Sequence, residues 1–108
     1  LDGVAIRVPT PNVSCVDLTV EFSREVTETE IMDAMHQWSQ IQGGLFAVNE
    51  EPLVSIDFNH HPASSIFDAT QLMVNGRLVK LLFWYDNEWG YSNRVIDLLL
   101  HWQSISRE

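Results

Sequence analysis

One stretch of this chain constrains its fold more than any other: an apolar run at Leu78–Phe83 leads directly into Trp84–Arg94. The run is rich in branched and aromatic residues, which is typical of a strand buried on both faces. Val95–Trp102 then carries apolar residues at helical spacing. The residues between them therefore form a strand-to-helix junction. Such a junction brings N–H groups, a carboxamide, a carboxylate and two phenols to one end of a sheet, which predicts a small-ligand site but not a reaction.

Two strands are predicted before the first helix. Val4, Ile6 and Val8 alternate with other residues and predict a strand that ends in a proline-containing turn at residues 9–12. Arg7 projects from the opposite face of that strand, where composition alone favours a surface ion pair. The alternation over residues 16–22 predicts the second strand. Cys15 has no His, Lys or Arg near it in sequence, so we expect a small buried hydrophobe rather than a nucleophile.

A helix is predicted to begin after Thr27, because Thr27-Glu28-Thr29-Glu30 has the pattern of a capping box. Gly43-Gly44 supplies a left-handed stop. The apolar stripe of this helix is expected to cover one face of the sheet. It comprises Ile31, Ala34, Met35, Trp38 and Ile41.

The second half of the chain is predicted to be mostly strand. A short extended piece at residues 45–48 is followed by strands at 53–58, 64–74 and 78–85. Asn75-Gly76 is a strong hairpin signal and predicts a two-residue turn. Together these elements predict one domain over residues 1–108, of the α+β class, with a mostly antiparallel or mixed sheet covered by two helices.

Composition excludes some classes of partner. The 108 residues carry a formal charge of −9, which disfavours nucleic acid and anionic membranes. No apolar run is long enough to span a bilayer, and one Cys suits a reducing compartment, so a cytoplasmic protein is expected. His60 and His61 are adjacent, point apart in extended chain and have no second pair at ligand spacing, so no metal site is predicted.

The sequence contains no paired acid and base, nucleophilic triad, phosphate-binding loop or dinucleotide glycine fingerprint. Two classes stay open at this point. The chain is either a ligand-binding α+β module whose site is the junction at Asp86–Tyr91, or part of an enzyme whose reactive groups lie elsewhere. Because the chain opens at Leu1 with a strand pattern already under way, we favour the second.

Three blocks in order resemble glyceraldehyde-3-phosphate dehydrogenase. They are Arg7–Ser14 with the strand that follows it, Ser64–Ala69, and Trp84–Arg94, which matches the family's WYDNEWGYSNR signature without a gap. The resemblance runs over nearly the whole chain. It implies the C-terminal part of a catalytic domain, with the NAD-binding Rossmann domain absent from this chain.

The resemblance also implies a reaction in the intact enzyme. A thiolate attacks an aldehyde, hydride passes to NAD, and the acyl group moves from the thioester to phosphate or water. The family's nucleophilic Cys, in its SCTTN motif, and its general-base His are expected upstream of this chain. Cys15 lies outside that motif and is not the nucleophile. The 108-residue piece alone is therefore expected to be inactive.

Four positions inherit roles from the resemblance. Arg7 matches the Arg that binds the substrate phosphate, a task that suits a planar, permanently charged donor fork. Asn87 matches the Asn that hydrogen-bonds the nicotinamide carboxamide. Tyr91 is expected near the nicotinamide and Tyr85 near the reactive centre, with weaker roles. Asp86 is assigned to helix capping.

Two alternatives remain. Asn59-His60 and Asp68–Gln71 look more like the erythrose-4-phosphate dehydrogenase branch, which releases a free acid. Tyr85, Tyr91 and Ser92 follow the phosphorylating branch, which we favour. A free-standing binding or interaction module is the rival from another class. Family members are usually homotetramers, and the strand Leu78–Phe83, apolar on both faces, leads us to expect that the piece self-associates through its sheet.

Overall fold

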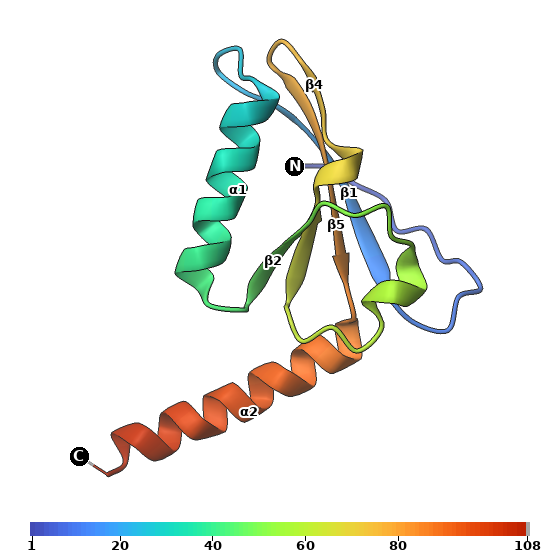
Figure 1. Ribbon diagram of the computed structural model, residues 1–108. Helices are drawn as coiled ribbons and strands as arrows, with labels where there is room; N and C mark the ends of the chain where they lie inside the picture. Colours follow the sequence, from blue (N-terminus) through green and yellow to red (C-terminus); the bar gives the residue numbers. More distant parts are fainter. Residues whose placement is uncertain (108) are drawn as a thin grey trace.

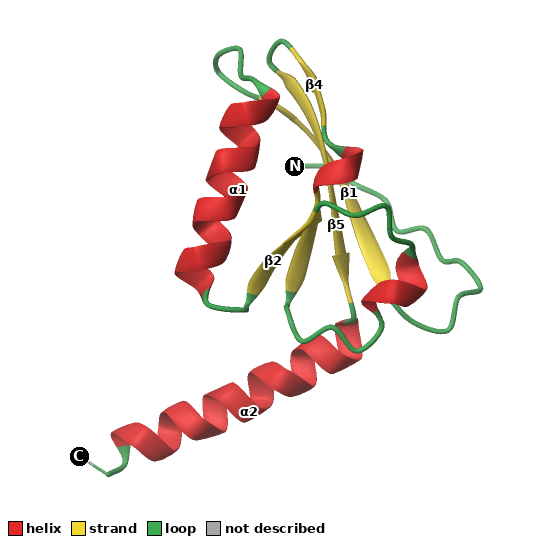
Figure 2. Cartoon of the chain, viewed as in Figure 1, coloured by secondary structure: helices red, strands yellow, loops and turns green. Residues whose placement is uncertain are grey.

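A computed structural model describes residues 1–107 as a five-stranded mixed sheet with two α-helices (Figures 1 and 2). The predicted α+β class is confirmed. In chain order the elements are β1 (Ser14–Glu21), α1 (Glu28–Gln42), β2 (Phe46–Asn49), η1 (Ser55–Phe58), β3 (Ser65–Asp68), η2 (Ala69–Gln71), β4 (Met73–Asn75), β5 (Leu78–Tyr85) and α2 (Asn87–Ile105).

Strand β5 is the centre of the sheet. It pairs antiparallel with β1 on one side and with β3 and β4 on the other, while β2 pairs parallel with β3 at the edge. The predicted hairpin is confirmed between β4 and β5, where Asn75 pairs with Leu78 across a two-residue loop. Gly76 has a φ of +61° in that loop, a conformation that glycine adopts without strain.

Alternate residues of the strands build two separate cores on the two faces of the sheet. On one face, Phe67, Val79 and Leu81 pack with Ile31 of α1. On the other face, Ile66 packs with Phe58, whose ring stacks on Trp84 at a centroid distance of 5.4 Å. Neighbouring residues of β3 thus serve opposite faces, as the period of two in a strand requires.

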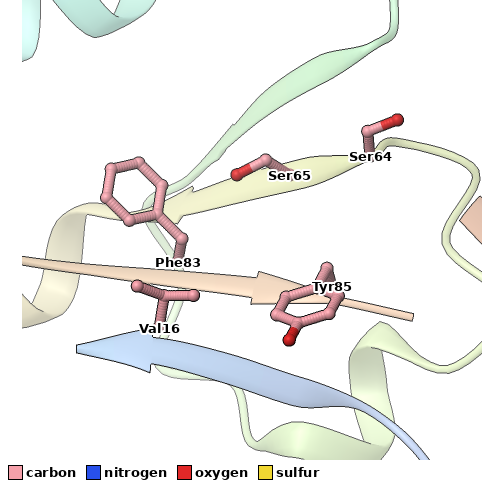
Figure 3. Close-up of a pocket in the computed structure, with 5 residues that line it drawn as sticks. All are labelled: Val16, Ser64, Ser65, Phe83 and Tyr85. Atoms are coloured by element: carbon pink, nitrogen blue, oxygen red, sulfur yellow. The ribbon is translucent and has the colours of Figure 1, made fainter. Parts of the chain in front are cut away.

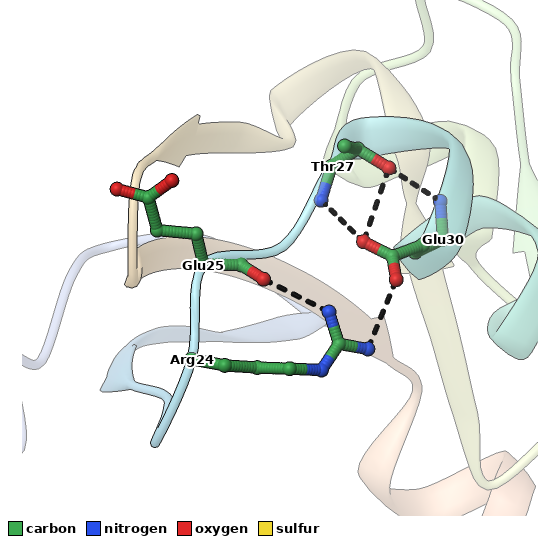
Figure 4. Close-up of polar contacts among 4 residues, drawn as sticks. All are labelled: Arg24, Glu25, Thr27 and Glu30. Carbon is green, nitrogen blue, oxygen red and sulfur yellow. Dashed lines mark hydrogen bonds and ion pairs between the residues drawn. The ribbon is translucent and has the colours of Figure 1, made fainter.

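Helix α1 begins at the predicted capping box (Figure 4). The Thr27 hydroxyl accepts from the Glu30 N–H at 3.2 Å, and a Glu30 carboxylate oxygen accepts from the Thr27 N–H at 2.8 Å. Arg24 donates to the other Glu30 oxygen at 2.9 Å. This guanidinium and the Thr27 N–H lower the pKa of Glu30, so the carboxylate form of the cap is favoured. Gly43 ends the helix in the left-handed conformation, as predicted.

The stripe predicted for α1 is only partly correct. Ile31 and Met35 face the sheet, but Ala34, Trp38 and Ile41 are exposed. The helix is rotated because Ser39 also faces the sheet, where its hydroxyl donates to the Phe46 carbonyl at 3.1 Å. The period of the pattern was sufficient to predict the helix, but it did not fix which edge of the stripe is buried.

Three strand predictions were wrong. Residues 4–8 form no strand, and their apolar side chains are exposed. None of the described strands pairs with them, so no ladder of backbone hydrogen bonds holds them extended. Residues 53–58 instead contain the 3₁₀ turn η1, where Asp57 accepts from the Val54 N–H at 2.9 Å. Residues 64–74 are divided into β3 and β4 because the Asp68 carboxylate accepts from the Thr70 N–H at 3.1 Å, which starts η2.

Helix α2 differs from α1 in its relation to the sheet. Its first turns lie against the end of β5, and the remainder extends away from the body (Figure 1). Its apolar side chains are therefore exposed on all sides. They include Val95, Ile96, Leu98, Leu99, Leu100, Trp102 and Ile105. Among residues 1–107, no helix is long and apolar enough to cross a membrane.

Strand Leu78–Phe83 was expected to offer its sheet face to other copies. Within this chain, however, it is paired along both edges, and Val79 and Leu81 are buried. Cys15 was expected to be buried but is exposed. The reason is that β1 is an edge strand and Cys15 lies on the sheet face away from α1. The residues that cover Trp84 on that face do not extend over Cys15.

Thr27→Ala is expected to lower the free energy of unfolding by about 1 kcal/mol, because the substitution leaves the Glu30 N–H without its cap acceptor. Urea unfolding followed by helical circular dichroism measures the change. Thr29→Ala, in the same first turn, is the matched control and should be neutral or slightly stabilising, since alanine favours the helix. Equal losses in the two variants would show that the cap does not stabilise α1.

Candidate functional site

The predicted strand-to-helix junction is present, and Asp86 lies at its centre. Strand β5 ends at Tyr85, and α2 begins at Asn87. Asp86 is only 1% exposed, and its Oδ1 accepts from the Trp89 N–H at 3.0 Å, so it caps the helix as predicted. The direction of β5 and this cap together determine where the first turn of α2 starts.

The second oxygen of Asp86 joins two segments that are distant in the sequence. Its Oδ2 accepts from the His60 N–H at 2.8 Å and from the Asn12 side-chain amide at 2.9 Å. The same amide nitrogen of Asn12 donates to Asn59 Oδ1 at 2.8 Å. Both carboxylate oxygens are therefore hydrogen-bonded, which offsets the cost of burying the charge.

The charge state of Asp86 follows from these contacts. Burial by itself would raise the pKa of the Asp86 carboxyl, but hydrogen bonds from the Trp89 and His60 N–H groups and from the Asn12 amide outweigh it. The pKa is held below its ordinary value. The group is consequently a carboxylate at neutral pH and accepts hydrogen bonds on both oxygens.

The loop before β3 packs closely on the first turns of α2. A Cβ added at Gly90 would lie 3.2 Å from the Ala63 carbonyl oxygen, so this position favours glycine. The His60 ring lies 4.6 Å from the Trp89 ring, and Arg94 Nη1 donates to the Ser64 hydroxyl at 3.1 Å. These contacts fix the orientation of the helix start.

Asn87 and Tyr91 lie one turn apart on α2 and are both exposed. Residues at this spacing share a helix face. In the described part of the chain neither side chain has a hydrogen-bond partner. An amide, which both donates and accepts, and a phenol are thus available to a ligand at this end of the sheet.

Tyr85 lies on the sheet rather than on the helix. It lines a shallow hollow of 390 Å³ on the face that α1 partly covers (Figure 3). Val16 and Phe83 form its apolar floor, and Ser64 and Ser65 contribute hydroxyl groups along one side. Tyr85 thus belongs to the sheet side of the junction, whereas Asn87 and Tyr91 belong to the helix side.

Arg7 lies in the segment before β1, which has no regular secondary structure, and its side chain is exposed. Four of the six basic side chains form ion pairs with acids. They are Arg24, Arg77, Lys80 and Arg94. No acid pairs with Arg7 within residues 1–107, although the chain has fifteen Asp and Glu residues. The surface ion pair that composition favoured for Arg7 is therefore absent among these residues.

A second buried carboxylate, Asp68, lies on β3 beside β5. It accepts from the Trp84 indole N–H at 2.8 Å, from Thr70 through both its N–H and its hydroxyl, and from the Asn49 amide at 3.4 Å. All these partners belong to the protein itself, so Asp68 is a structural group. In the described residues no cluster of His, Cys, Asp or Glu could hold a metal ion.

Sequence reasoning missed Asn12 and His60 as parts of this junction. Asn12 precedes Asp86 by 74 residues and His60 precedes it by 26. No local pattern indicates such partners. One signal was available for Asp86 itself, because an Asp followed by Asn-Glu-Trp at the start of an apolar helix predicts a cap.

Known proteins match this chain over most of its length. A family model described as glyceraldehyde 3-phosphate dehydrogenase, C-terminal domain, matches residues 1–87. The glyceraldehyde-3-phosphate dehydrogenase of Pseudomonas aeruginosa is 51% identical over 100 residues, which are 93% of this chain and 30% of the relative. The chromosomal glyceraldehyde-3-phosphate dehydrogenase of Cupriavidus necator is 53% identical over 98 residues, 90% of this chain and 29% of the relative.

Glyceraldehyde-3-phosphate dehydrogenase 2 of Staphylococcus aureus is 52% identical over 99 residues, which are 91% of this chain and 28% of that protein. The chain thus spans about 30% of the length of the curated relatives that it matches. It corresponds to one part of those proteins.

The lowered pKa of Asp86 predicts a pH-dependent contribution to stability. The pKa of Asp86 is lower in the folded chain than in the unfolded one, so the ionised carboxylate stabilises the fold at any pH above the ordinary pKa of Asp. This stabilisation is lost as pH falls through the lowered pKa of the folded chain. Asp86→Asn should therefore cost about 2 kcal/mol at neutral pH and progressively less in acid. Urea unfolding from pH 7 downward measures the difference.

Asp33→Asn removes an exposed acid from α1 and is the control for the change in charge. It should have little effect at any pH in this range. A cost of Asp86→Asn that stays constant as pH falls would contradict the assignment of Asp86 as a carboxylate in the folded state.

Proposed function

Because this chain belongs to the glyceraldehyde-3-phosphate dehydrogenase family, we propose that it is the C-terminal part of a longer, phosphorylating, NAD-dependent enzyme that oxidises glyceraldehyde 3-phosphate. The observation that best supports this proposal is the unbroken match at Trp84–Arg94. This stretch folds into a strand end, a buried cap and a helix start with two exposed polar side chains. The NAD-binding domain, the nucleophilic Cys and the general-base His belong to chain outside these 108 residues.

Arg7 is proposed to bind the substrate phosphate. Its guanidinium is exposed and has no acidic partner among the described residues, unlike four of the other basic side chains. An unpaired guanidinium in a chain with a net charge of −9 retains its donors for a ligand. Its planar fork matches two phosphate oxygens, which favours Arg over Lys here.

Asn87 is proposed to bind the nicotinamide carboxamide of NAD, with Tyr91 beside it. The donor set suits this group, since an amide side chain pairs with a carboxamide through one donor and one acceptor. Both side chains are exposed and share a helix face, so they can meet one planar ligand. NAD would supply the hydride acceptor when bound, and the task of these residues is to orient its ring.

Tyr85 is proposed to lie near the reactive centre, at the edge of the hollow that it lines with Ser64 and Ser65. The hollow is open, and its floor is apolar. Cys15, on the opposite face of the sheet from the hollow residues Val16 and Phe83, has no place in this arrangement. The nucleophile is therefore assigned to another part of the enzyme.

The erythrose-4-phosphate dehydrogenase branch is the second candidate, because Asn59-His60 and Asp68–Gln71 resemble it. These residues also have structural partners in this chain. Asp68 binds Thr70 through two hydrogen bonds, and the His60 N–H binds Asp86. These contacts give the residues a structural role in either branch, so they do not decide between the two. We retain glyceraldehyde 3-phosphate as the substrate and phosphate as the acyl acceptor because Tyr85, Tyr91 and Ser92 follow the phosphorylating branch. A non-catalytic binding module remains the alternative of another class.

The complete reading frame that encodes this chain should produce NADH from glyceraldehyde 3-phosphate, NAD and phosphate, whereas the 108-residue chain alone should produce none. Absorbance at the NADH band measures both. In the complete enzyme, Arg7→Ala should raise KM for the aldehyde by about 100-fold, since a charged hydrogen-bonding group is lost.

Arg77→Ala is the matched control, because Arg77 is a surface residue paired with Glu21 at the hairpin. It should leave KM unchanged. Turnover by the 108-residue chain that is sensitive to Arg7→Ala would contradict the proposal, and turnover of erythrose 4-phosphate to a free acid would favour the second candidate. A reading frame that starts at Leu1 would favour the module.

The isolated chain is expected to self-associate, mainly through α2 rather than through the sheet as first predicted. The helix exposes apolar residues on all sides, whereas most apolar residues of the sheet are buried or half-buried. Light scattering at rising concentration measures the mass, and Leu98→Glu with Trp102→Glu should shift it toward the monomer. A monomer at high concentration, or association unaffected by these changes, would refute a role of α2.

A further inference from the structure

The N-terminal segment is attached to the rest of the chain at one place. Residues 1–11 are all exposed, and Asn12 and Val13 are the first two that are not. Val13 is 8% exposed in the core with Phe58 and Ile66. Arg7 therefore depends for its position on an attachment that begins five residues after it.

That attachment combines strain with a specific hydrogen bond. Val13 has a φ of +68°, a conformation that is unfavourable for a β-branched residue. The surrounding contacts must hold it there. Asn12, directly before it, donates to Asp86 Oδ2 at 2.9 Å and to Asn59 Oδ1 at 2.8 Å. The direction in which the segment leaves the sheet is thus set next to Asp86.

The same carboxylate also positions Asn87. Oδ1 of Asp86 accepts from the Trp89 N–H, which fixes the first turn of α2, and Asn87 is the first residue of that turn. One buried side chain thereby contacts both the segment that carries Arg7 and the turn that carries Asn87. Among the described residues, no hydrogen bond or ion pair links Arg7 to α2 or Asn87 to the N-terminal segment.

We propose that Asp86, through Asn12, is a positioning residue that holds the Arg7 segment in a fixed relation to Asn87. In the complete enzyme this would set the separation between the bound phosphate and the nicotinamide. The assignment rests on the proposed function for the roles of Arg7 and Asn87. It goes beyond the capping role of Asp86, because a cap alone needs neither Asn12 nor a second carboxylate oxygen.

Two substitutions separate the positioning role from the cap. Asn12→Ala removes the hydrogen bonds of the N-terminal segment to Asp86 and to Asn59, and it leaves both the cap and the His60 contact of Asp86. Asp86→Asn keeps an oxygen for the Trp89 N–H, but its NH₂ group then faces the donors of Asn12 and His60. The first variant should act on the Arg7 segment alone, and the second on both.

The geometric part is tested on the 108-residue chain itself by ¹⁵N relaxation and amide exchange. Asn12→Ala should lower the heteronuclear NOE of residues 7–13 while the Trp89 amide keeps its protection. Asp86→Asn should affect both regions, and Asp33→Asn should affect neither. Unchanged order at residues 7–13 in both Asn12→Ala and Asp86→Asn would overturn the proposal.

The functional part is tested by steady-state kinetics of the complete enzyme. Asn12→Ala should raise KM for the aldehyde phosphate about tenfold and leave KM for NAD unchanged, because displacement of a binding group costs affinity for its own ligand. Asp86→Asn should raise both KM values. A parallel rise of both KM values in Asn12→Ala, together with a lower melting temperature, would mean general destabilisation and would overturn the proposal.

The two hypotheses can fail separately. If the complete wild-type protein oxidises no sugar-phosphate aldehyde, the proposed function fails, and the relaxation data still decide whether Asp86 and Asn12 order the segment. If the enzyme is active and Arg7→Ala impairs it, but Asn12→Ala changes neither KM nor the order of residues 7–13, only the positioning role fails.

Discussion

The structure depends on the pairing of one central strand with almost every other strand. β5 carries hydrogen bonds to β1, β3 and β4 and then leads directly into α2. Its alternate side chains contribute to both cores, with Val79 and Leu81 on the α1 face and Trp84 on the other. A change that weakens β5 would therefore affect the sheet, both cores and the candidate site together.

Two buried carboxylates lie beside the C-terminal end of this strand. Asp68 binds the indole of Trp84, the second residue before Asp86, and Asp86 binds the segments around Asn12 and His60. Each carboxylate has protein donors on both oxygens. A buried charge that lost one of these donors would be costly. Such groups therefore fix the relative positions of chain segments more sharply than apolar packing does.

Local patterns were sufficient for the elements that carry their own signals. The Thr27–Glu30 capping box, the Gly76 hairpin and the Asp86 cap were all predictable because each involves residues at most four apart. Patterns failed where a distant partner decides the outcome. Residues 4–8 alternate like a strand but pair with none of the described strands, and Trp38 fits the helical period but lies outside the buried face.

The residues of the candidate site likewise fall into those that a local pattern predicts and those that depend on a distant partner. Asn87 and Tyr91 could be placed on one helix face from their spacing, and the residue types at this junction indicated a ligand. Asn12 could not be found, since its link to Asp86 spans 74 residues. The exposure of α2 could not be predicted either, because the helical spacing of its apolar residues is equally consistent with a packed helix.

The charge of the chain constrains how a phosphate could bind at Arg7. The net charge of −9 opposes the approach of an anion, but charges beyond a Debye length of about 8 Å are largely screened at physiological salt. The affinity of Arg7 for phosphate therefore depends mainly on the groups close to its guanidinium. A single exposed Arg in water holds phosphate weakly, because the ion pair is screened and its ordering is costly. Tight binding needs further donors around Arg7, and the relatives, of which this chain spans about 30%, have the additional length that could supply them.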